Sequence, residues 1–142
     1  MRTHRTSLQT VEAVAGYAAD SRGNGVAYVR VAAPSEEHLL RIPFSVRRGR
    51  DLNGREVGYG ALAAIAGELR KRGVRKAAFR LDDPQLIEDL DAHRDVPPGL
   101  VLPYVRLRCA LNQFADSSLL HDEGAADLSQ RARAEVALHV AA

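Results

Sequence analysis

The first third of the chain alternates between apolar, β-branched runs and short polar turns. Residues 10–19 (TVEAVAGYAA) predict a strand, and the Gly/Asn-rich turn SRGNG follows it. Residues 25–33 and residues 38–46 predict two more strands. Pro43 places the third strand at a sheet edge, because proline has no N–H group to donate to a neighbour. This part of the chain therefore predicts an antiparallel three-stranded meander.

The rest of the chain alternates helices with strands. Residues 54–72 put Val57, Leu62 and Leu69 on one broad apolar face, which predicts a helix, and Gly73 is a typical residue to end it. The elements predicted after it are a strand at 74–81, a helix at 84–93 that begins with Pro84, a last strand at 100–107, a loop or helical turn at 111–120 and an amphipathic closing helix at 122–140.

This element order predicts one α/β domain. In the order β-β-β-α-β-α-β-α, strands that are joined through helices run parallel by right-handed crossovers. The antiparallel meander makes the five-stranded sheet mixed, and helices flank it. A length of 142 residues fits a single domain over residues 1–142, in which we expect residues 1–8 to be a flexible lead.

The composition is that of a soluble globular protein. Hydrophobic residues make up 46% of the chain and charged residues 27%, which is enough for a core. No apolar run reaches the length of a membrane span, and no apolar segment follows the basic N-terminus as a signal peptide requires. We therefore expect no membrane partner and a cytoplasmic location. Cys109 is the only cysteine, which excludes an internal disulfide, and we expect it to be a small buried hydrophobe.

Basic residues gather in two blocks, although the net charge is only +2. The first block consists of Arg41, Arg47, Arg48, Arg50 and Arg55, and the second of Arg70, Lys71, Arg72, Arg75, Lys76 and Arg80. Such blocks can contact the phosphates of a nucleic acid. They can equally reflect a general preference for arginine in the genome, or the preference of helix C-termini for cations.

Acidic residues stand at or near the ends of four predicted elements. Asp20 ends the first strand, Glu56 lies in the first turn of the long helix, Asp82 and Asp83 end the fourth strand, and Asp116 follows the last strand. Ligands of open α/β sheets lie at the carboxyl ends of the strands, so we expect Asp20 and Asp83 to meet if their strands are parallel neighbours. Two carboxylates about 4 Å apart repel by about 4 kcal/mol at an effective dielectric near 20. A divalent cation that prefers oxygen ligands, Mg²⁺ or Mn²⁺, removes this repulsion.

The element order and the acids resemble the ribonuclease H family. AADSRGNG is similar to the family's opening Asp-Gly-Ser and Gly-Asn turn, and NGRE is similar to its Asn-x-x-Glu motif. LDDPQLIEDL is similar to its Thr-Asp-Ser run, and YVRLRCALNQFADSSL to its Trp-Val followed by Asn-x-x-x-Asp-x-Leu, which places Asn112 and Asp116. The resemblance covers about residues 10–140, and four weak motifs in the right order are more specific than any one of them.

The resemblance implies a metal-dependent nuclease that cleaves the RNA strand of RNA/DNA hybrids. Two ions, Mg²⁺ or Mn²⁺, would lie about 4 Å apart and bind the scissile phosphate between them. The implied catalytic metal ligands are Asp20, Glu56, Asp83 and Asp116, of which Asp20 would bridge both ions. The implied nucleic-acid contacts are Asn24, Asn53 and Gln85, together with Arg47, Arg48 and Arg50 on the phosphate backbone.

The sequence departs from the family pattern at several points. Ser21 stands where the family has glycine, Asp82 replaces a hydroxyl residue, and no histidine lies between residues 100 and 120. Only DVPPG separates the second predicted helix from the predicted last strand, which leaves no room for a basic handle helix. The altered opening motif favours the alternative of a non-catalytic ribonuclease H-like module that binds nucleic acid or a protein. A DNA-cleaving nuclease or resolvase with the same acids and an unrelated α/β interaction protein are further alternatives.

Each candidate acid also has a purely structural explanation. Asp20 suits a turn, Glu56 suits the positive end of a helix dipole, and Asp83 suits the N-cap before Pro84. The acids that could replace Asp116 as the fourth ligand are Asp122, Glu123 and Asp127. The five histidines show no ligand spacing, and we expect surface or core positions for His4, His38, His93, His121 and His139.

Overall fold

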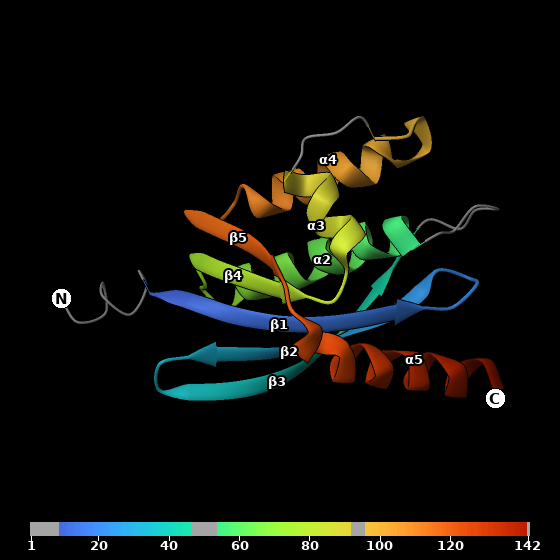
Figure 1. The fold of residues 1–142 in the computed structure, drawn as a ribbon, viewed down its shortest axis with the longest axis horizontal. Coiled ribbons are helices and arrows are strands. Elements are labelled where there is room, and N and C mark those ends of the chain that lie inside the picture. The colour runs from blue at the N-terminus through green and yellow to red at the C-terminus, as the bar shows by residue number, and fades with distance from the viewer. Residues whose placement is uncertain (1–8, 47–53, 92–95, 142) are drawn as a thin grey trace.

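The sheet is mixed and has five strands (Figure 1). The computed structural model describes residues 9–46, 54–91 and 96–141, with side chains up to residue 138. Its elements are β1 (Thr10–Ala19), β2 (Asn24–Ala33), β3 (Glu36–Ser45), α2 (Gly54–Lys71), β4 (Lys76–Leu81), α3 (Pro84–Asp91), a 3-10 turn (Pro98–Leu100), α4 (Val101–Leu111), β5 (Asp116–His121), a second 3-10 turn (Glu123–Ala125) and α5 (Ala126–Ala141). The strand order is β3-β2-β1-β4-β5, so β3 is at an edge as Pro43 predicted. Strand β2 pairs antiparallel with both β1 and β3, whereas β4 runs parallel to both β1 and β5.

Helices cover both faces of the sheet. α2, α3 and α4 lie on one face, and α5 lies on the other, against β1 and β2 (Figure 1). The predicted mixed α/β sheet with flanking helices is thereby confirmed, as is the parallel pairing of the first and fourth strands. None of the described helices combines the length and the apolar character that a bilayer crossing requires.

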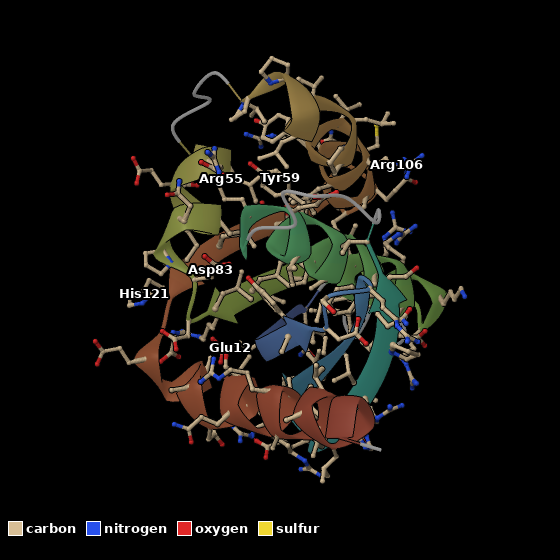
Figure 2. The ribbon with its side chains drawn as sticks, turned by 90° about the vertical axis from the view of Figure 1, so that its right-hand side faces the viewer. Glu12, Arg55, Tyr59, Asp83, Arg106 and His121 are labelled. Carbon is tan, nitrogen blue, oxygen red and sulfur yellow. The ribbon has the colours of Figure 1, made fainter. Side chains whose placement is uncertain are left out.

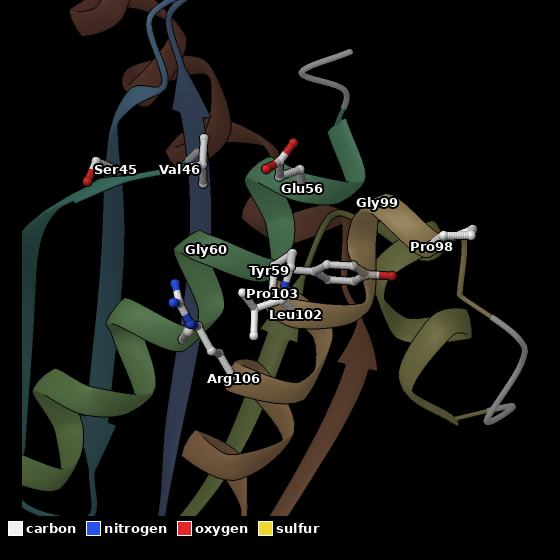
Figure 3. Close-up of a pocket in the computed structure, with 11 residues that line it drawn as sticks. Ser45, Val46, Glu56, Tyr59, Gly60, Pro98, Gly99, Leu102, Pro103 and Arg106 are labelled. Carbon is white, nitrogen blue, oxygen red and sulfur yellow. The ribbon is translucent and has the colours of Figure 1, made fainter. Parts of the chain in front are cut away.

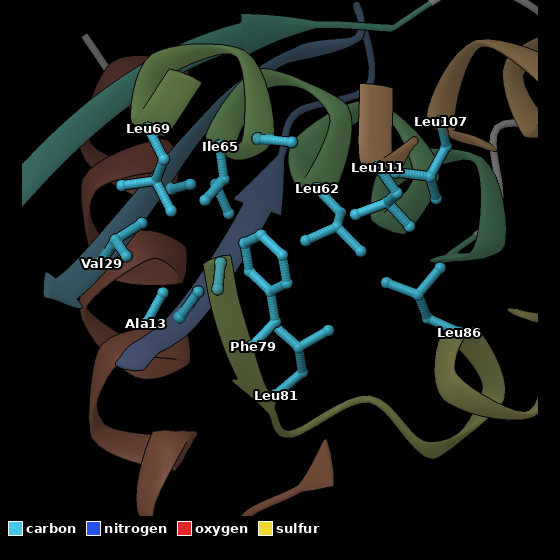
Figure 4. Close-up of a cluster of buried hydrophobic side chains, with 14 of the residues drawn as sticks. Ala13, Val29, Leu62, Ile65, Leu69, Phe79, Leu81, Leu86, Leu107 and Leu111 are labelled. Atoms are coloured by element: carbon cyan, nitrogen blue, oxygen red, sulfur yellow. The ribbon is translucent and has the colours of Figure 1, made fainter. Parts of the chain in front are cut away.

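The main core lies between the sheet and α2 (Figure 4). Phe79 and Leu81 on β4 and Leu62 and Ile65 on α2 are completely buried. The helix spacing of the apolar positions in α2 puts them on the face that meets the sheet, and each such side chain contributes about 1.5–3 kcal/mol on burial. Gly73 ends this helix with φ +86°, a left-handed conformation that glycine adopts without strain.

On the opposite face, α5 packs closely on β1. A Cβ atom on Gly16 would lie 2.1 Å from the backbone nitrogen of Ser129, so any larger residue would force the helix away from the strand. A second apolar cluster joins β2 to α5 through Tyr28, Leu128 and Ala132. The close approach fixes α5 against the strand that leads into the turn of the first candidate acid, Asp20.

The segment between α3 and β5 differs from the prediction. Residues 101–107, within the predicted last strand, belong to α4, and β5 covers residues that the pattern assigned to a loop or helical turn. The reason is the spacing of Leu100, Tyr104, Leu107 and Leu111, which recur every three to four residues and pack into the main core. Pro103 stands in the first turn of α4, where a helix needs no N–H donor. The element order is therefore β-β-β-α-β-α-α-β-α.

Candidate functional site

Asp83 lies between β4 and α3, at the carboxyl end of β4 (Figure 2). Its Oδ1 accepts a hydrogen bond from the backbone N–H of Leu86 at 3.2 Å, which caps the N-terminus of α3. Its Oδ2 accepts a hydrogen bond from the hydroxyl of Tyr17 at 2.5 Å. Both oxygens of the carboxylate are therefore engaged by protein donors, and the capping explanation of this residue is confirmed.

Tyr17 occupies the position on β1 that faces Asp83. The last paired residues of the two parallel strands are Ala15 and Leu81, and Tyr17 and Asp83 each lie two residues beyond them. Burial raises the pKa of Tyr17 well above its ordinary value, and the charge of Asp83 and the hydrogen bond to it raise that pKa further. The phenol therefore stays protonated and acts as a permanent donor to the carboxylate.

Gly58 is the residue of α2 that faces this pair. A Cβ atom at Gly58 would lie 3.0 Å from Oδ2 of Asp83 and 3.3 Å from the hydroxyl of Tyr17. Glu56 is two residues earlier, which is about 200° around the helix axis. It lines a different cavity, between α2 and α4, together with Tyr59 and Arg106 (Figure 3). The residue of α2 that faces Asp83 is therefore a glycine and not an acid.

Asp20 lies at the tip of the β1–β2 hairpin. Its Oδ1 accepts hydrogen bonds from the backbone N–H groups of Arg22 at 2.8 Å and Asn24 at 3.0 Å, which stabilises the turn. It is three residues beyond Tyr17, or about 10 Å along an extended strand. It lines a cavity beside Glu135 of α5, on the face of the sheet opposite to α2. The turn explanation is therefore confirmed, and Asp20 does not meet Asp83.

Asp116 begins β5 instead of following the last strand. Its register partner on β4 is Lys76, the first residue of that strand, whereas Asp83 lies beyond its last residue. The length of β4 alone separates the two acids by about 16 Å. The predicted position of Asp116 after the last strand is wrong, because the strand starts sixteen residues later than the β-branched pattern suggested.

The four candidate acids do not form the predicted two-metal site. Each lies in its own surroundings: Asp20 in the hairpin, Glu56 beside α4, Asp83 in the α3 cap and Asp116 at the opposite edge of the sheet. Over the residues that the structure describes, no group of three or more His, Cys, Asp or Glu side chains is arranged to hold a metal ion. Mg²⁺ and Mn²⁺ require several converging oxygen ligands, so this donor set does not fit them.

Other acids at the carboxyl ends of β4 and β5 lie close to basic side chains. Oδ1 of Asp82 lies 3.6 Å from Nε2 of His121, and Oδ2 of Asp122 lies 3.8 Å from a guanidinium nitrogen of Arg80. The same guanidinium contacts Glu12 at 3.0 Å. At this end of the parallel strands, Asp82, Asp83 and Asp122 therefore outnumber Arg80 and His121.

The candidate nucleic-acid contacts are only partly described. Asn24 is exposed at the start of β2, whereas the amide of Gln85 donates to the buried carboxylate of Asp89 at 2.9 Å. Four other candidates lie outside the described residues: Arg47, Arg48, Arg50 and Asn53. The amide of Gln85 is therefore already engaged in a hydrogen bond within α3.

The sequence patterns missed a buried polar network between α2 and α3. Asp89, which is only 2% exposed, accepts two hydrogen bonds at 3.0 Å from Arg55 and one at 2.6 Å from the hydroxyl of Tyr59. Burial by itself raises the pKa of Asp89, but the bonds from Tyr59, Arg55 and Gln85 outweigh it and hold this pKa below its ordinary value. The sequence signal for this network was the position of Asp89, an acid between leucines on the inner face of α3.

Cys109 and the described histidines have simple positions. Cys109 is exposed on α4, so the prediction of a buried hydrophobe is wrong, because the segment is a helix that turns this residue outward. His38 is exposed beside Glu36, and His121 is exposed beside Asp82, as expected for surface histidines.

A group of cations lies where α2 ends and β4 begins, at the other end of β4 from Asp82 and Asp83. Lys71, Arg72 and Arg75 are exposed, and Lys76 is half-buried. Arg72 pairs with Glu68 one turn earlier at 3.1 Å. These four cations, called the basic edge below, belong to the second basic block of the sequence and lie at the opposite end of β4 from Asp82 and Asp83.

Comparison with known proteins gives structural but not sequence matches. No protein-family model and no curated protein matches the sequence. Ribonuclease H1 from the halophilic archaeon Halobacterium salinarum NRC-1 is 21% identical, with a TM-score of 0.67 over 89% of this chain and 93% of that one. The N-terminal ribonuclease H domain of rv2228c from Mycobacterium tuberculosis is 20% identical, with a TM-score of 0.65 over 94% and 99%. LC11-RNase H1, isolated from compost by a metagenomic approach, is 12% identical, with a TM-score of 0.69 over 94% and 99%.

These likenesses cover nearly the whole of each compared chain, so the agreement extends to the complete domain. Identities of 12–21% establish the arrangement of the backbone and leave the chemistry to be argued from the residues. The sheet order β3-β2-β1-β4-β5, with α2 on one face and α5 on the other, is shared with solved ribonuclease H structures: this chain has the ribonuclease H-like fold.

Proposed function

We propose that this chain is a non-catalytic ribonuclease H-like module that binds nucleic acid. The observation that carries the proposal is the hydrogen bond from Tyr17 to Asp83, which engages an oxygen of the candidate metal ligand at the carboxyl end of β4. A phenol donor occupies the carboxylate oxygen that a cation would need. The two-metal hydrolysis of RNA/DNA hybrids would require Asp20 and Glu56 to leave their own faces of the fold, so binding without cleavage accounts better for the geometry.

A nucleic-acid partner is supported by the fold and by the distribution of charge. LC11-RNase H1, which has the same fold, has been crystallised in complex with an RNA/DNA hybrid. In this chain the basic edge offers Lys71, Arg72 and Arg75 to solvent. Arginine and lysine at such a surface bind phosphates in a salt-dependent way, because binding releases condensed counterions. The acidic end of the sheet, with Asp82 and Asp122, repels phosphates, so we assign the contact to the basic edge.

Binding and cleavage can be separated with one set of substrates. A fluorescently labelled RNA/DNA hybrid, duplex RNA and duplex DNA of one sequence are titrated in the presence of a chelator, with anisotropy as the measurement. The same substrates are then incubated with Mg²⁺ or Mn²⁺ and resolved on a gel. We expect saturable binding with chelator, no cleavage with either metal, and an affinity that falls steeply as salt rises.

Charge reversal locates the contact. The double variant Lys71→Glu, Arg75→Glu should weaken binding at least about tenfold and lower the salt slope by about 2, because each phosphate contact contributes about one. Arg133→Glu, an exposed change on α5, is the matched control and should leave the affinity within about twofold. Metal-dependent cutting that Asp83→Asn abolishes would overturn the non-catalytic assignment. Absence of binding to all three duplexes at about 50 mM salt would overturn the nucleic-acid assignment.

A further inference from the structure

Helix α4 presents a second apolar face, which points to solvent. Val101 is 47% exposed, Leu102 55% and Val105 47%, and Cys109 is exposed as well. These residues are spaced i, i+1, i+4 and i+8, so they form one stripe along the whole helix, called the α4 stripe below. Leu39, Leu120 and Leu138 are the other large apolar residues that are exposed among the described side chains, and they lie on three different elements. A concentration of this kind marks an interaction surface rather than scattered surface residues.

A cavity of about 310 Å³ lies directly beside the α4 stripe, between α2, α4 and the end of β3 (Figure 3). Tyr59 and Ala63 line it from α2, and Leu102 and Pro103 line it from α4. Leu102 belongs to both the stripe and the cavity, so the two form one continuous surface. Its volume is at the small end of the range for binding pockets and suits an inserted apolar side chain. A groove between two packed helices is also the usual seat of a third, amphipathic helix.

The described charged residues that line the cavity are Arg106 on α4 and Glu56 on α2. α4 carries Arg106 and Arg108 and no acid. Arg108 is directed inward, where it donates to the hydroxyl of Tyr104 at 2.9 Å, whereas Arg106 is exposed at the rim of the cavity. Glu56 also lines the cavity but is already engaged in an interaction of its own. A partner with an acidic polar face would therefore find a complementary cation, and a second copy of this chain would place two basic α4 helices together.

We infer that the α4 stripe and the adjoining cavity form a docking surface for an amphipathic helix with an acidic polar face, supplied by another protein. Its apolar side chains lie along Val101, Leu102 and Val105, with one of them in the cavity, and its acids face Arg106. This surface shares no residue with the basic edge.

The test uses two synthetic helical peptides of about 18 residues, with leucines at i, i+3, i+4 and i+7 and either glutamates or lysines elsewhere. Binding to the whole chain is followed by anisotropy of the labelled peptide. We expect the glutamate peptide to bind and the lysine peptide to bind at least about tenfold more weakly. Val105→Asp should weaken the glutamate peptide at least about tenfold, because it puts a like charge at the centre of the contact. Arg106→Glu should reverse the preference between the peptides.

Leu138→Asp is the matched control, since Leu138 is 72% exposed on α5, the helix that covers the opposite face of the sheet. It should leave the affinity within about twofold, and all variants should keep the wild-type urea midpoint because they change exposed positions. Three outcomes would overturn the inference: no saturable binding of the glutamate peptide up to about 100 μM, undiminished binding by Val105→Asp, or equal binding of both peptides. Sedimentation that shows a dimer, lost in Val105→Asp, would also overturn it by identifying a second copy as the occupant.

Discussion

Replacing Tyr17 with phenylalanine tests whether Asp83 is held by a structural hydrogen bond or is available as a metal ligand. The change removes one hydroxyl and leaves the packing of the ring. A hydrogen bond to a charged group contributes about 1.5–3 kcal/mol. Asp83 is half-buried, so water replaces part of the lost bond, and we expect the free energy of unfolding to fall by about 1–2 kcal/mol. Urea denaturation at neutral pH measures this difference directly.

A double-mutant cycle isolates the pair. Asp83→Asn retains an acceptor for the cap on Leu86 but removes the charge that the Tyr17 hydroxyl meets. We expect the two changes to couple by about 1–2 kcal/mol. A coupling below about 0.5 kcal/mol would refute the view that this bond stabilises the fold, since residues without a shared interaction are additive within that range.

Adding Mg²⁺ to the same denaturation series separates the two roles of Asp83. A ligand at a hundred times its dissociation constant stabilises the folded state by about 2.7 kcal/mol. We expect no measurable shift in wild type or in Tyr17→Phe, because Asp20 and Glu56 lie on other faces of the fold. A stabilisation of this size that Asp83→Asn removes would show that a metal site assembles after all.

Three further predictions follow from the same contacts. Asp89→Asn should lower the free energy of unfolding by about 2–4 kcal/mol at neutral pH, because it leaves Arg55 without its buried partner. In the wild type, this stability should be present above the ordinary carboxyl pKa near 4 and be lost as the pH falls through the lower native pKa of Asp89. Measuring the urea midpoint over a range of acid pH values would reveal the loss. Burial and the bond to Asp89 raise the pKa of Tyr59 to about 12, so its contribution should be complete below about pH 10 and disappear as the pH rises towards 12, and Tyr59→Phe should flatten the alkaline part of the same curve. The double variant Tyr17→Asp, Gly58→Glu should gain Mn²⁺ binding, measured by calorimetry, since it supplies two carboxylates at the positions that face Asp83; a titration without heat of binding would show that those positions do not converge.

The sheet was largely predictable, because each strand and the long helix carry a local signal. Alternation and turn residues marked β1, β2 and β3, and the apolar face with a closing glycine marked α2. The parallel pairing of β1 with β4 followed from the connection through a helix, not from any residue on the strands. α4 was missed since Val101 and Val105 suit a strand locally, and only the core contacts of Leu107 and Leu111 reveal the helix.

The candidate site was less predictable, because it depends on register. Motif order put Asp20 at the end of β1, but pairing places Tyr17, three residues earlier, beside Asp83. An odd shift along a strand also turns a side chain to the opposite face, which is why Asp20 lies towards α5. Glu56 raises the same problem on a helix, where two residues of displacement change the direction by about 200°. The spacing of motifs in a sequence determines neither strand register nor side-chain direction accurately enough to predict a metal site.

Under the proposed non-catalytic role, the pair of Tyr17 and Asp83 stabilises this end of the sheet without a metal ion. Two facing carboxylates would repel by about 4 kcal/mol at an effective dielectric near 20 unless a cation lay between them. A tyrosine in place of one of them replaces that repulsion with a hydrogen bond, and Gly58 leaves room for the phenol because it has no side chain on that side of α2. The hydrogen bond contributes about 1–2 kcal/mol to the folded state, and it engages an oxygen that a metal ion would need. Under the proposed non-catalytic role, a stabilising hydrogen bond and two-metal chemistry are alternatives at this position, and Tyr17 provides the first.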